Sequence, residues 1–86
     1  MYEIAYTPFA IRTLQRMPRD RADLIRRKIR AVAADPYGEL GKNVAKLTGQ
    51  PGFRLRVGDW RVIYELDDQA HILRVLDVGS RGSIYR

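Results

Sequence analysis

Alternating apolar and polar residues at both ends of the chain enclose a stretch with helical spacing. Residues 2–6 place aromatic and β-branched side chains at every second position, which is typical of a half-buried strand. From residue 53 to residue 78 the period is again two, and turn-forming residues at 58–59 and 67–69 divide the stretch. The pattern therefore predicts an N-terminal strand and, later, a three-stranded antiparallel meander.

Two helices are expected between these strands. Thr7 suits the N-cap of the first helix and Pro8 its first position, while Pro18 interrupts the helical pattern. A longer helix then runs up to Pro36, which ends it. Its apolar stripe at helical spacing consists of Ala22, Leu24, Ile25, Ile29, Val32 and Ala33.

The segment 36–52 is rich in Gly and Pro, so we expect a long ordered loop with at most a short turn of helix at 44–47. A loop of this length in a small domain often carries function. Because the helices precede most of the sheet, we expect one α+β domain over residues 1–86. In it, the N-terminal strand and the meander form a four-stranded sheet, both helices pack on one face, and the other face meets solvent or a ligand.

The amino-acid composition limits the kinds of site and partner that the chain can have. The chain has 86 residues, no cysteine and one histidine, so we expect neither disulfides nor a metal site nor a cofactor. It lacks an apolar run of about 18 residues that could span a bilayer, and it lacks a secretory h-region, so we expect a cytoplasmic protein without membrane contact. The net charge of +6 attracts phosphate polyanions and, equally, acidic protein partners.

A tight turn at residues 58–59 would fix the register of the strands beside it. Arg56 then faces Arg61, and Arg54 lies on the same side, opposite to the apolar residues of these strands. Like charges facing each other destabilise a strand pair by up to about 1 kcal/mol. Guanidinium groups stay charged near neutral pH, so solvent, nearby carboxylates or a bound polyanion must relieve the repulsion.

The place of Arg74 depends on the next turn. With a turn centred on residues 68–69, Arg74 falls opposite Ile63 and joins the row of Arg54. The same register puts His71 beside Leu66 on the apolar face, which favours a structural role for the histidine.

Further basic residues lie after the last strand and on the second helix. Arg81 and Arg86 offer forked donors to phosphate, and Tyr85 offers a ring on which a base can stack. A flexible end that folds back over the sheet would add them to a polynucleotide platform, whereas an ordinary solvated face is the alternative interpretation. The helix face is either solvated or a docking surface; it carries Arg19, Arg21, Arg26, Arg27, Lys28 and Arg30.

Four short motifs follow one another along the chain: Lys46-Leu47-Thr48-Gly49, Phe53-Arg54-Leu55-Arg56-Val57, Gly58-Asp59-Trp60-Arg61-Val62-Ile63-Tyr64, and Val78-Gly79-Ser80-Arg81 followed by Ile84-Tyr85. With the order of elements, they resemble the RelE family of the RelE/ParE toxin superfamily over essentially the whole length. The resemblance implies a RelE-like microbial ribonuclease-type fold. It implies catalytic roles for Arg54, Arg56, Arg61, Arg81 and Tyr85, and we expect Lys46, Arg74 and Arg86 to bind RNA.

The resemblance further implies the toxin of a type II toxin–antitoxin system. Such a toxin is a ribosome-dependent endoribonuclease, an mRNA interferase, that cuts mRNA in the ribosomal A site. The 2′-hydroxyl of the RNA attacks the adjacent phosphate, which leaves a 2′,3′-cyclic phosphate and a 5′-hydroxyl. A RelB-like antitoxin is expected to wrap the toxin in a hetero-oligomer and block this face.

The chain departs from the family pattern at two positions. Arg54 and Arg56 stand where the best-known member has lysines. An arginine, whose pKa lies above about 12, is a poor proton donor or acceptor. Proton transfer in the expected reaction is therefore left without an assigned group.

Two other functions stay open. A ParE-like toxin shares the fold but inhibits DNA gyrase by binding and has no nuclease activity; the basic sheet residues with a C-terminal tyrosine favour RNA cleavage over it. A non-catalytic RNA-binding or ribosome-binding module would use the same basic face, and the missing base keeps this interpretation open.

Overall fold

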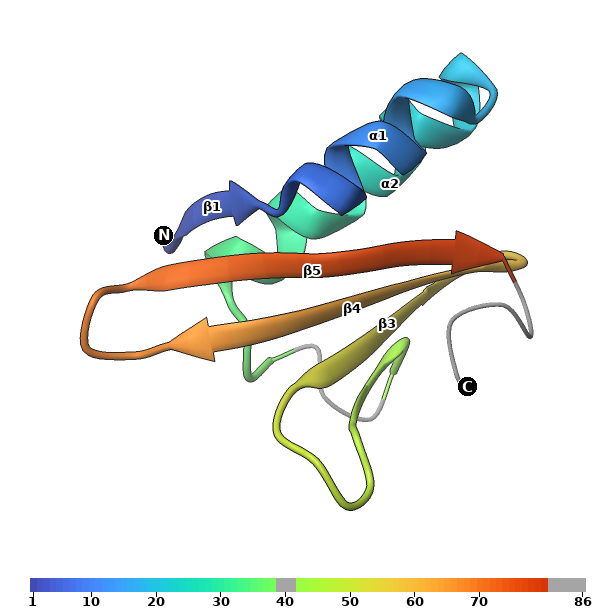
Figure 1. The fold of residues 1–86 in the computed structure, drawn as a ribbon. Coiled ribbons are helices and arrows are strands. Elements are labelled where there is room, and N and C mark those ends of the chain that lie inside the picture. The colour runs from blue at the N-terminus through green and yellow to red at the C-terminus, as the bar shows by residue number, and fades with distance from the viewer. Residues whose placement is uncertain (39–41, 81–86) are drawn as a thin grey trace.

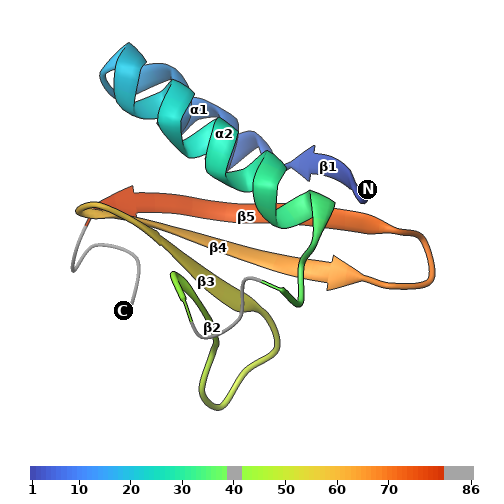
Figure 2. The same ribbon diagram turned by 180° about the vertical axis from the view of Figure 1, so that it is seen from behind.

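Two helices cover one face of a five-stranded sheet in the computed structural model, which describes residues 1–38 and 42–80 (Figures 1 and 2). The elements follow one another as β1 (Glu3–Tyr6), α1 (Pro8–Arg16), α2 (Arg19–Ala34), β2 (Val44–Lys46), β3 (Phe53–Val57), β4 (Trp60–Asp67) and β5 (Ile72–Ser80). The strand order is β1-β5-β4-β3-β2. The α+β class predicted from the sequence is confirmed.

The sheet has a strand that the sequence analysis did not predict. Residues 44–46 pair antiparallel with β3 rather than forming a loop or a turn of helix, so the sheet has five strands and not four. Val44 is only 2% exposed and packs into the core, and the Arg56 N–H donates to the carbonyl of Asn43 at 2.8 Å. This pairing covers an edge of β3 whose backbone groups would otherwise lack partners. The sheet is mixed, since β1 pairs parallel with β5.

Helix ends lie where the sequence predicts them. The Thr7 hydroxyl accepts a hydrogen bond from the Ala10 N–H at 3.1 Å and donates one to the Leu76 carbonyl at 2.8 Å, so the N-cap of α1 is also tied to β5. Pro18 separates α1 from α2, and α2 ends before Pro36. The described chain contains no helix of the length and apolarity needed to cross a membrane.

The core fills the space between the helices and the sheet. The predicted stripe of α2 faces it, with Leu24 half-buried and the other members buried. From the sheet, the alternate residues of β3 and β4 point into the same layer, as expected from a period of two. The largest fully buried side chains are those of Tyr64, Ile25, Ile29, Leu73, Val32, Val44, Val62 and Val75.

The turn between β4 and β5 differs from the expected one. Asp67 pairs with Ile72, so residues 68–71 form a longer turn than one centred on 68–69, and a β-bulge shifts the register between Ile63 and Tyr64. Arg74 consequently lies opposite Glu65 and not opposite Ile63. The register shift in the turn is two residues, so Arg74 keeps the face on which it was expected.

His71 also departs from the prediction. It lies in this turn, outside the ladder, with a positive φ of 57°. Its ring stacks on that of Tyr2 at a centroid distance of 4.6 Å, instead of lying beside Leu66. The histidine is therefore exposed at one end of the sheet and contacts the N-terminal segment.

Candidate active site

The arginines of the β3–β4 hairpin share the side of the sheet that faces away from the helices, which we term the outer face. Arg56 pairs with Arg61, and Arg54 pairs with Ile63, as the turn at 58–59 predicts. Residues between them in the two strands point into the core, which leaves the arginines outside. The structure thus brings together three of the predicted catalytic residues: Arg54, Arg56 and Arg61.

Two of these guanidinium groups contain a buried nitrogen atom. The Nε atoms of Arg54 and Arg61 are withdrawn from solvent and have no hydrogen-bond partner in the described part of the chain. Leaving such a donor unpaired costs about 1–3 kcal/mol. Because no ion pair in residues 1–38 and 42–80 involves Arg54, Arg56 or Arg61, their charges remain available to an anionic ligand.

Arg74 lies on the outer face in a different environment. Its Nη1 is 3.8 Å from Oε1 of Glu65 across the β4–β5 pair. Both side chains are more than one third exposed, so the pair contributes little to stability, but it offsets the charge of Arg74. Arg74 is therefore a weaker anion-binding candidate than the hairpin arginines.

Lys46 does not lie with these residues. It pairs with Phe53, and residues that face each other in a ladder project to the same side of the sheet. Since Phe53 is part of the core cluster, the register assigns Lys46 to the helix side. Lys42, in contrast, lies near the hairpin arginines, because it lines a hollow of about 130 Å³ together with Arg54 and Arg56.

Lys42 was not among the site residues predicted from the sequence. Its proximity to Arg54 and Arg56 results from the pairing of β2 with β3, and the residues of β2 were expected in a loop. A three-residue strand is too short to show a period of two.

A second hollow, of about 400 Å³, lies further along the outer face. Its lining combines the polar side chains of Gln50, Glu65 and Asp77 with the apolar residues Leu47, Pro51, Ile63 and Leu76. Withdrawal from water raises the pKa of the Asp77 carboxyl, and the backbone N–H of Val78 opposes part of this shift. Asp77 was not predicted as a site residue, because its register depends on the bulge in the β4–β5 pair.

Arg81, Tyr85 and Arg86 lie outside the described residues. Their expected roles stay predictions. The last residue of β5, Ser80, lies opposite Trp60, and Gly79 lies opposite Arg61. The final strand thus ends next to the hairpin that carries the arginines.

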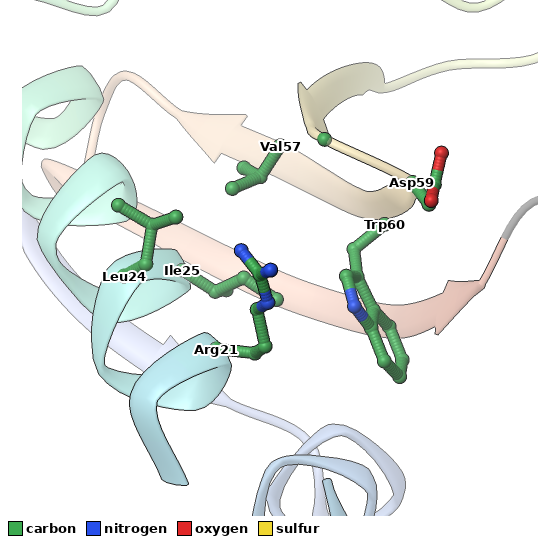
Figure 3. Close-up of a pocket in the computed structure, with 7 residues that line it drawn as sticks. Arg21, Leu24, Ile25, Val57, Asp59 and Trp60 are labelled. Atoms are coloured by element: carbon green, nitrogen blue, oxygen red, sulfur yellow. The ribbon is translucent and has the colours of Figure 1, made fainter. Parts of the chain in front are cut away.

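A third hollow lies on the helix side of the β3–β4 turn and is separate from the outer face. Arg21 and Leu24 of α2 border it on one side, and Val57 and Trp60 border it on the other, around a volume of about 190 Å³ (Figure 3). Arg21 is the residue of the predicted basic helix face that lines this hollow. Elsewhere on that face, Arg26 lies 3.9 Å from the carboxylate of Asp23.

A cluster of polar side chains at the β4–β5 turn, which we term the turn cluster, consists of Tyr2, Tyr37, Asp68 and His71. Both tyrosine hydroxyls donate to the Asp68 carboxylate, at 2.6 Å from Tyr2 and 2.8 Å from Tyr37. These hydrogen bonds lower the pKa of Asp68 and, together with its charge, raise the pKa of Tyr2 to about 12. The cluster joins the N-terminus, the end of α2 and the turn.

Comparison with known proteins gives the same assignment by sequence and by fold. A family model described as the ParE toxin of type II toxin–antitoxin systems matches residues 4–85. Toxin RelE of Mycobacterium tuberculosis is 33% identical over 93 aligned positions, which cover 99% of this chain and 87% of that protein. The chain therefore belongs to the RelE family of the RelE/ParE superfamily, the toxins of type II toxin–antitoxin systems.

Solved structures share the fold. The archaeal RelE–RelB complex from Pyrococcus horikoshii superposes with a TM-score of 0.79 at 24% identity, covering 95% of this chain and 97% of that chain. The intact Escherichia coli RelBE toxin–antitoxin complex gives a TM-score of 0.79 at 19% identity, with 93% of this chain and 96% of that chain covered. At these identities the likeness concerns the fold.

Proposed function

We propose that this toxin is a ribosome-dependent endoribonuclease that cuts mRNA in the ribosomal A site. The observation that carries the proposal is the gathering of Arg54, Arg56 and Arg61 on one face of the sheet, where the buried Nε donors of Arg54 and Arg61 have no hydrogen-bond partner among residues 1–38 and 42–80. A phosphodiester supplies the negative charge and the acceptor oxygens that such donors lack.

The arrangement suits cleavage by the RNA's own 2′-hydroxyl. In that reaction negative charge builds up on the oxygens of a five-coordinate phosphorus, and fixed cationic donors stabilise it. Arg56 and Arg61 face each other across the strands, so a phosphate placed between them meets donors from two sides. The ladder holds both backbones in position before RNA binds, which keeps the reorganisation small.

The proposed partner is a RelB-like antitoxin. Relatives of the same fold have been crystallised as RelE–RelB and RelBE toxin–antitoxin complexes. An acidic segment of an antitoxin would bind the outer face by charge complementarity and would exclude mRNA from it. The toxin would then be held inactive in a hetero-oligomer.

The experiment is cleavage of mRNA in a translating cell-free extract, with the cut positions mapped by primer extension. The wild-type chain is expected to cut inside translated codons, and Arg61→Ala is expected to lower the rate by about 100-fold or more, as loss of a transition-state donor does. Arg12→Ala is the matched control, because Arg12 is an exposed arginine of α1. Wild-type rates for Arg61→Ala, with cutting intact, would contradict the assigned site.

A gyrase-inhibiting, ParE-like function is the second candidate. The family model that matches residues 4–85 is described as a ParE toxin. The purified chain is tested for inhibition of DNA supercoiling by gyrase in parallel with the cleavage assay. Inhibition of supercoiling with mRNA left intact would replace the nuclease proposal with this one.

A further inference from the structure

The expected reaction needs a group that takes the proton of the 2′-hydroxyl, and the hairpin arginines do not provide it. A guanidinium with a pKa above about 12 has no free lone pair to offer near neutral pH. His71, the only histidine, lies at the β4–β5 turn against Tyr2. That position is at the end of β4 opposite to the arginine pair.

Asp77 is the carboxylate that the sheet places next to the arginines. It pairs with Ile63, whose other neighbour is Arg54, so Ile63 separates the two in one cross-strand row. Arg61 pairs with Gly79, which makes Asp77 its diagonal neighbour on the same face. Diagonal neighbours lie about 7–8 Å apart. That backbone spacing is within reach of a long side chain such as that of Arg61, so one nucleotide bound on this face could contact both the guanidinium and the carboxylate.

The surroundings of Asp77 differ from those of an ordinary surface carboxylate. It lines the 400 Å³ hollow together with apolar residues. In residues 1–38 and 42–80 no ion pair involves Asp77, whereas Glu65 in the same hollow pairs with Arg74. The charge of Asp77 is therefore not already used by an arginine.

The charged groups that can face Asp77 come from each neighbouring strand. They are Arg61 and Glu65 on β4, Arg74 on β5 itself, and Arg54 on β3 beyond Ile63. Residues 47–52, which also border the hollow, contain no titratable side chain. Desolvation is the largest cause of the raised pKa of Asp77. A raised pKa makes the carboxylate a stronger base, because a general base is most effective when its pKa lies near the working pH.

We propose that Asp77 is the general base of the cleavage reaction, an inference that rests on the proposed ribonuclease function. The Asp77 carboxylate takes the proton of the 2′-hydroxyl while the 2′-oxygen forms its bond to phosphorus. The bond between phosphorus and the 5′-oxygen then breaks. Water protonates the departing 5′-oxygen, and the hydroxide so formed removes the proton held by Asp77, which restores the carboxylate.

The experiment measures single-turnover cleavage of mRNA on programmed ribosomes as a function of pH. Asp77→Asn is expected to lower the rate by about 100-fold or more and to abolish the fall in rate on the acidic side of the profile. Asp77→Glu restores a carboxylate and is expected to recover the acidic limb at a reduced rate. Asp20→Asn makes the same chemical change at an exposed position of α2 and serves as the matched control.

Thermal melting of each variant separates a catalytic loss from a loss of fold, and Asp77→Ser provides a second folded variant if Asp77→Asn does not fold. A wild-type rate and an unchanged acidic limb for Asp77→Asn would overturn the inference while leaving the nuclease function in place. A reduced rate with an unchanged acidic limb would likewise overturn it, since Asp77 would then act through structure. Absence of cleavage by the wild-type chain would refute the nuclease function itself.

Discussion

The hairpin arginines of the outer face and the turn cluster lie at opposite ends of β4 and differ in how their charges are compensated. In the turn cluster, the Asp68 carboxylate receives two hydroxyl hydrogen bonds from segments far away in the chain. On the outer face, Arg56 and Arg61 face each other, and the buried Nε donors of Arg54 and Arg61 have no hydrogen-bond partner among the residues that the structure describes. The turn cluster thus stabilises the fold through internal hydrogen bonds, whereas the proposed function assigns the uncompensated arginines to an external ligand.

The largest effect is expected for the cleavage rate when Arg61 is given a carboxylate partner within the protein. Arg56→Glu replaces a pair of like charges by a Glu–Arg pair across the strands, which stabilises a hairpin by about 0.2–1 kcal/mol. The same change removes a phosphate donor and repels RNA, so cleavage should fall by about 100-fold or more. Urea denaturation measures the expected gain in stability, and the cleavage assay measures the expected loss of activity. A less stable protein, or one that still cuts normally, would show that the repulsion has no functional role.

A smaller effect is expected when the turn cluster loses a partner. Tyr2→Phe removes the 2.6 Å hydrogen bond to Asp68 and should lower the melting temperature by a few degrees, with cleavage unchanged. Because the pKa of Tyr2 is raised from 10.0 to about 12 in the folded protein, its contribution is fully present below pH 10 and disappears as the pH rises through about 12. The melting difference between wild type and Tyr2→Phe should close over that interval. A difference in melting temperature that persisted above this pH range would contradict the role of the Tyr2 hydroxyl as hydrogen-bond donor to Asp68.

The smallest effect is expected for the change in melting temperature that Asp77→Asn causes. The folded pKa of Asp77 is raised, so folding favours its protonated form, and this stabilisation is lost as the pH rises through the folded pKa. Asparagine carries no charge, so it removes the cost of desolvating the ionised carboxylate. This variant should therefore melt at a slightly higher temperature than wild type at neutral pH. At a pH well below the ordinary pKa of an aspartate, the two proteins should melt at the same temperature or the variant at a lower one. Lower stability at neutral pH would indicate that the ionised carboxylate has a structural partner.

The features that depend on local sequence were predictable. The turn at 58–59 specified the pairing of Arg56 with Arg61, and Thr7, Pro8 and Pro18 specified the helix ends. Each of these follows from residues adjacent in the chain, such as a two-residue turn or an N-cap. The side chains of the helix stripe and of the core face of β3 and β4 could be assigned for the same reason.

The features that depend on distant pairing were not predictable. A three-residue strand shows no period, so β2 and with it the position of Lys42 were missed. The turn at 68–71 contains His71 at a positive φ, a conformation that is uncommon for residues other than glycine and that no neighbouring residue signals. That longer turn decides the partner of Arg74, and the roles of Arg81, Tyr85 and Arg86 remain untested predictions.

The β-bulge between Ile63 and Tyr64 decides on which face of the sheet the Asp77 side chain lies. Val78 pairs with Val62, Asp77 with Ile63, and Val75 with Tyr64, so Leu76 is a surplus residue in β5. In an uninterrupted ladder, Leu76 would occupy the place opposite Ile63, and the alternation would turn the side chain of Asp77 toward the apolar layer beneath the helices. A chain that closed the bulge by pairing Leu76 with Ile63 would therefore exchange an outward-facing carboxylate for an ionisable group trapped among hydrocarbon side chains.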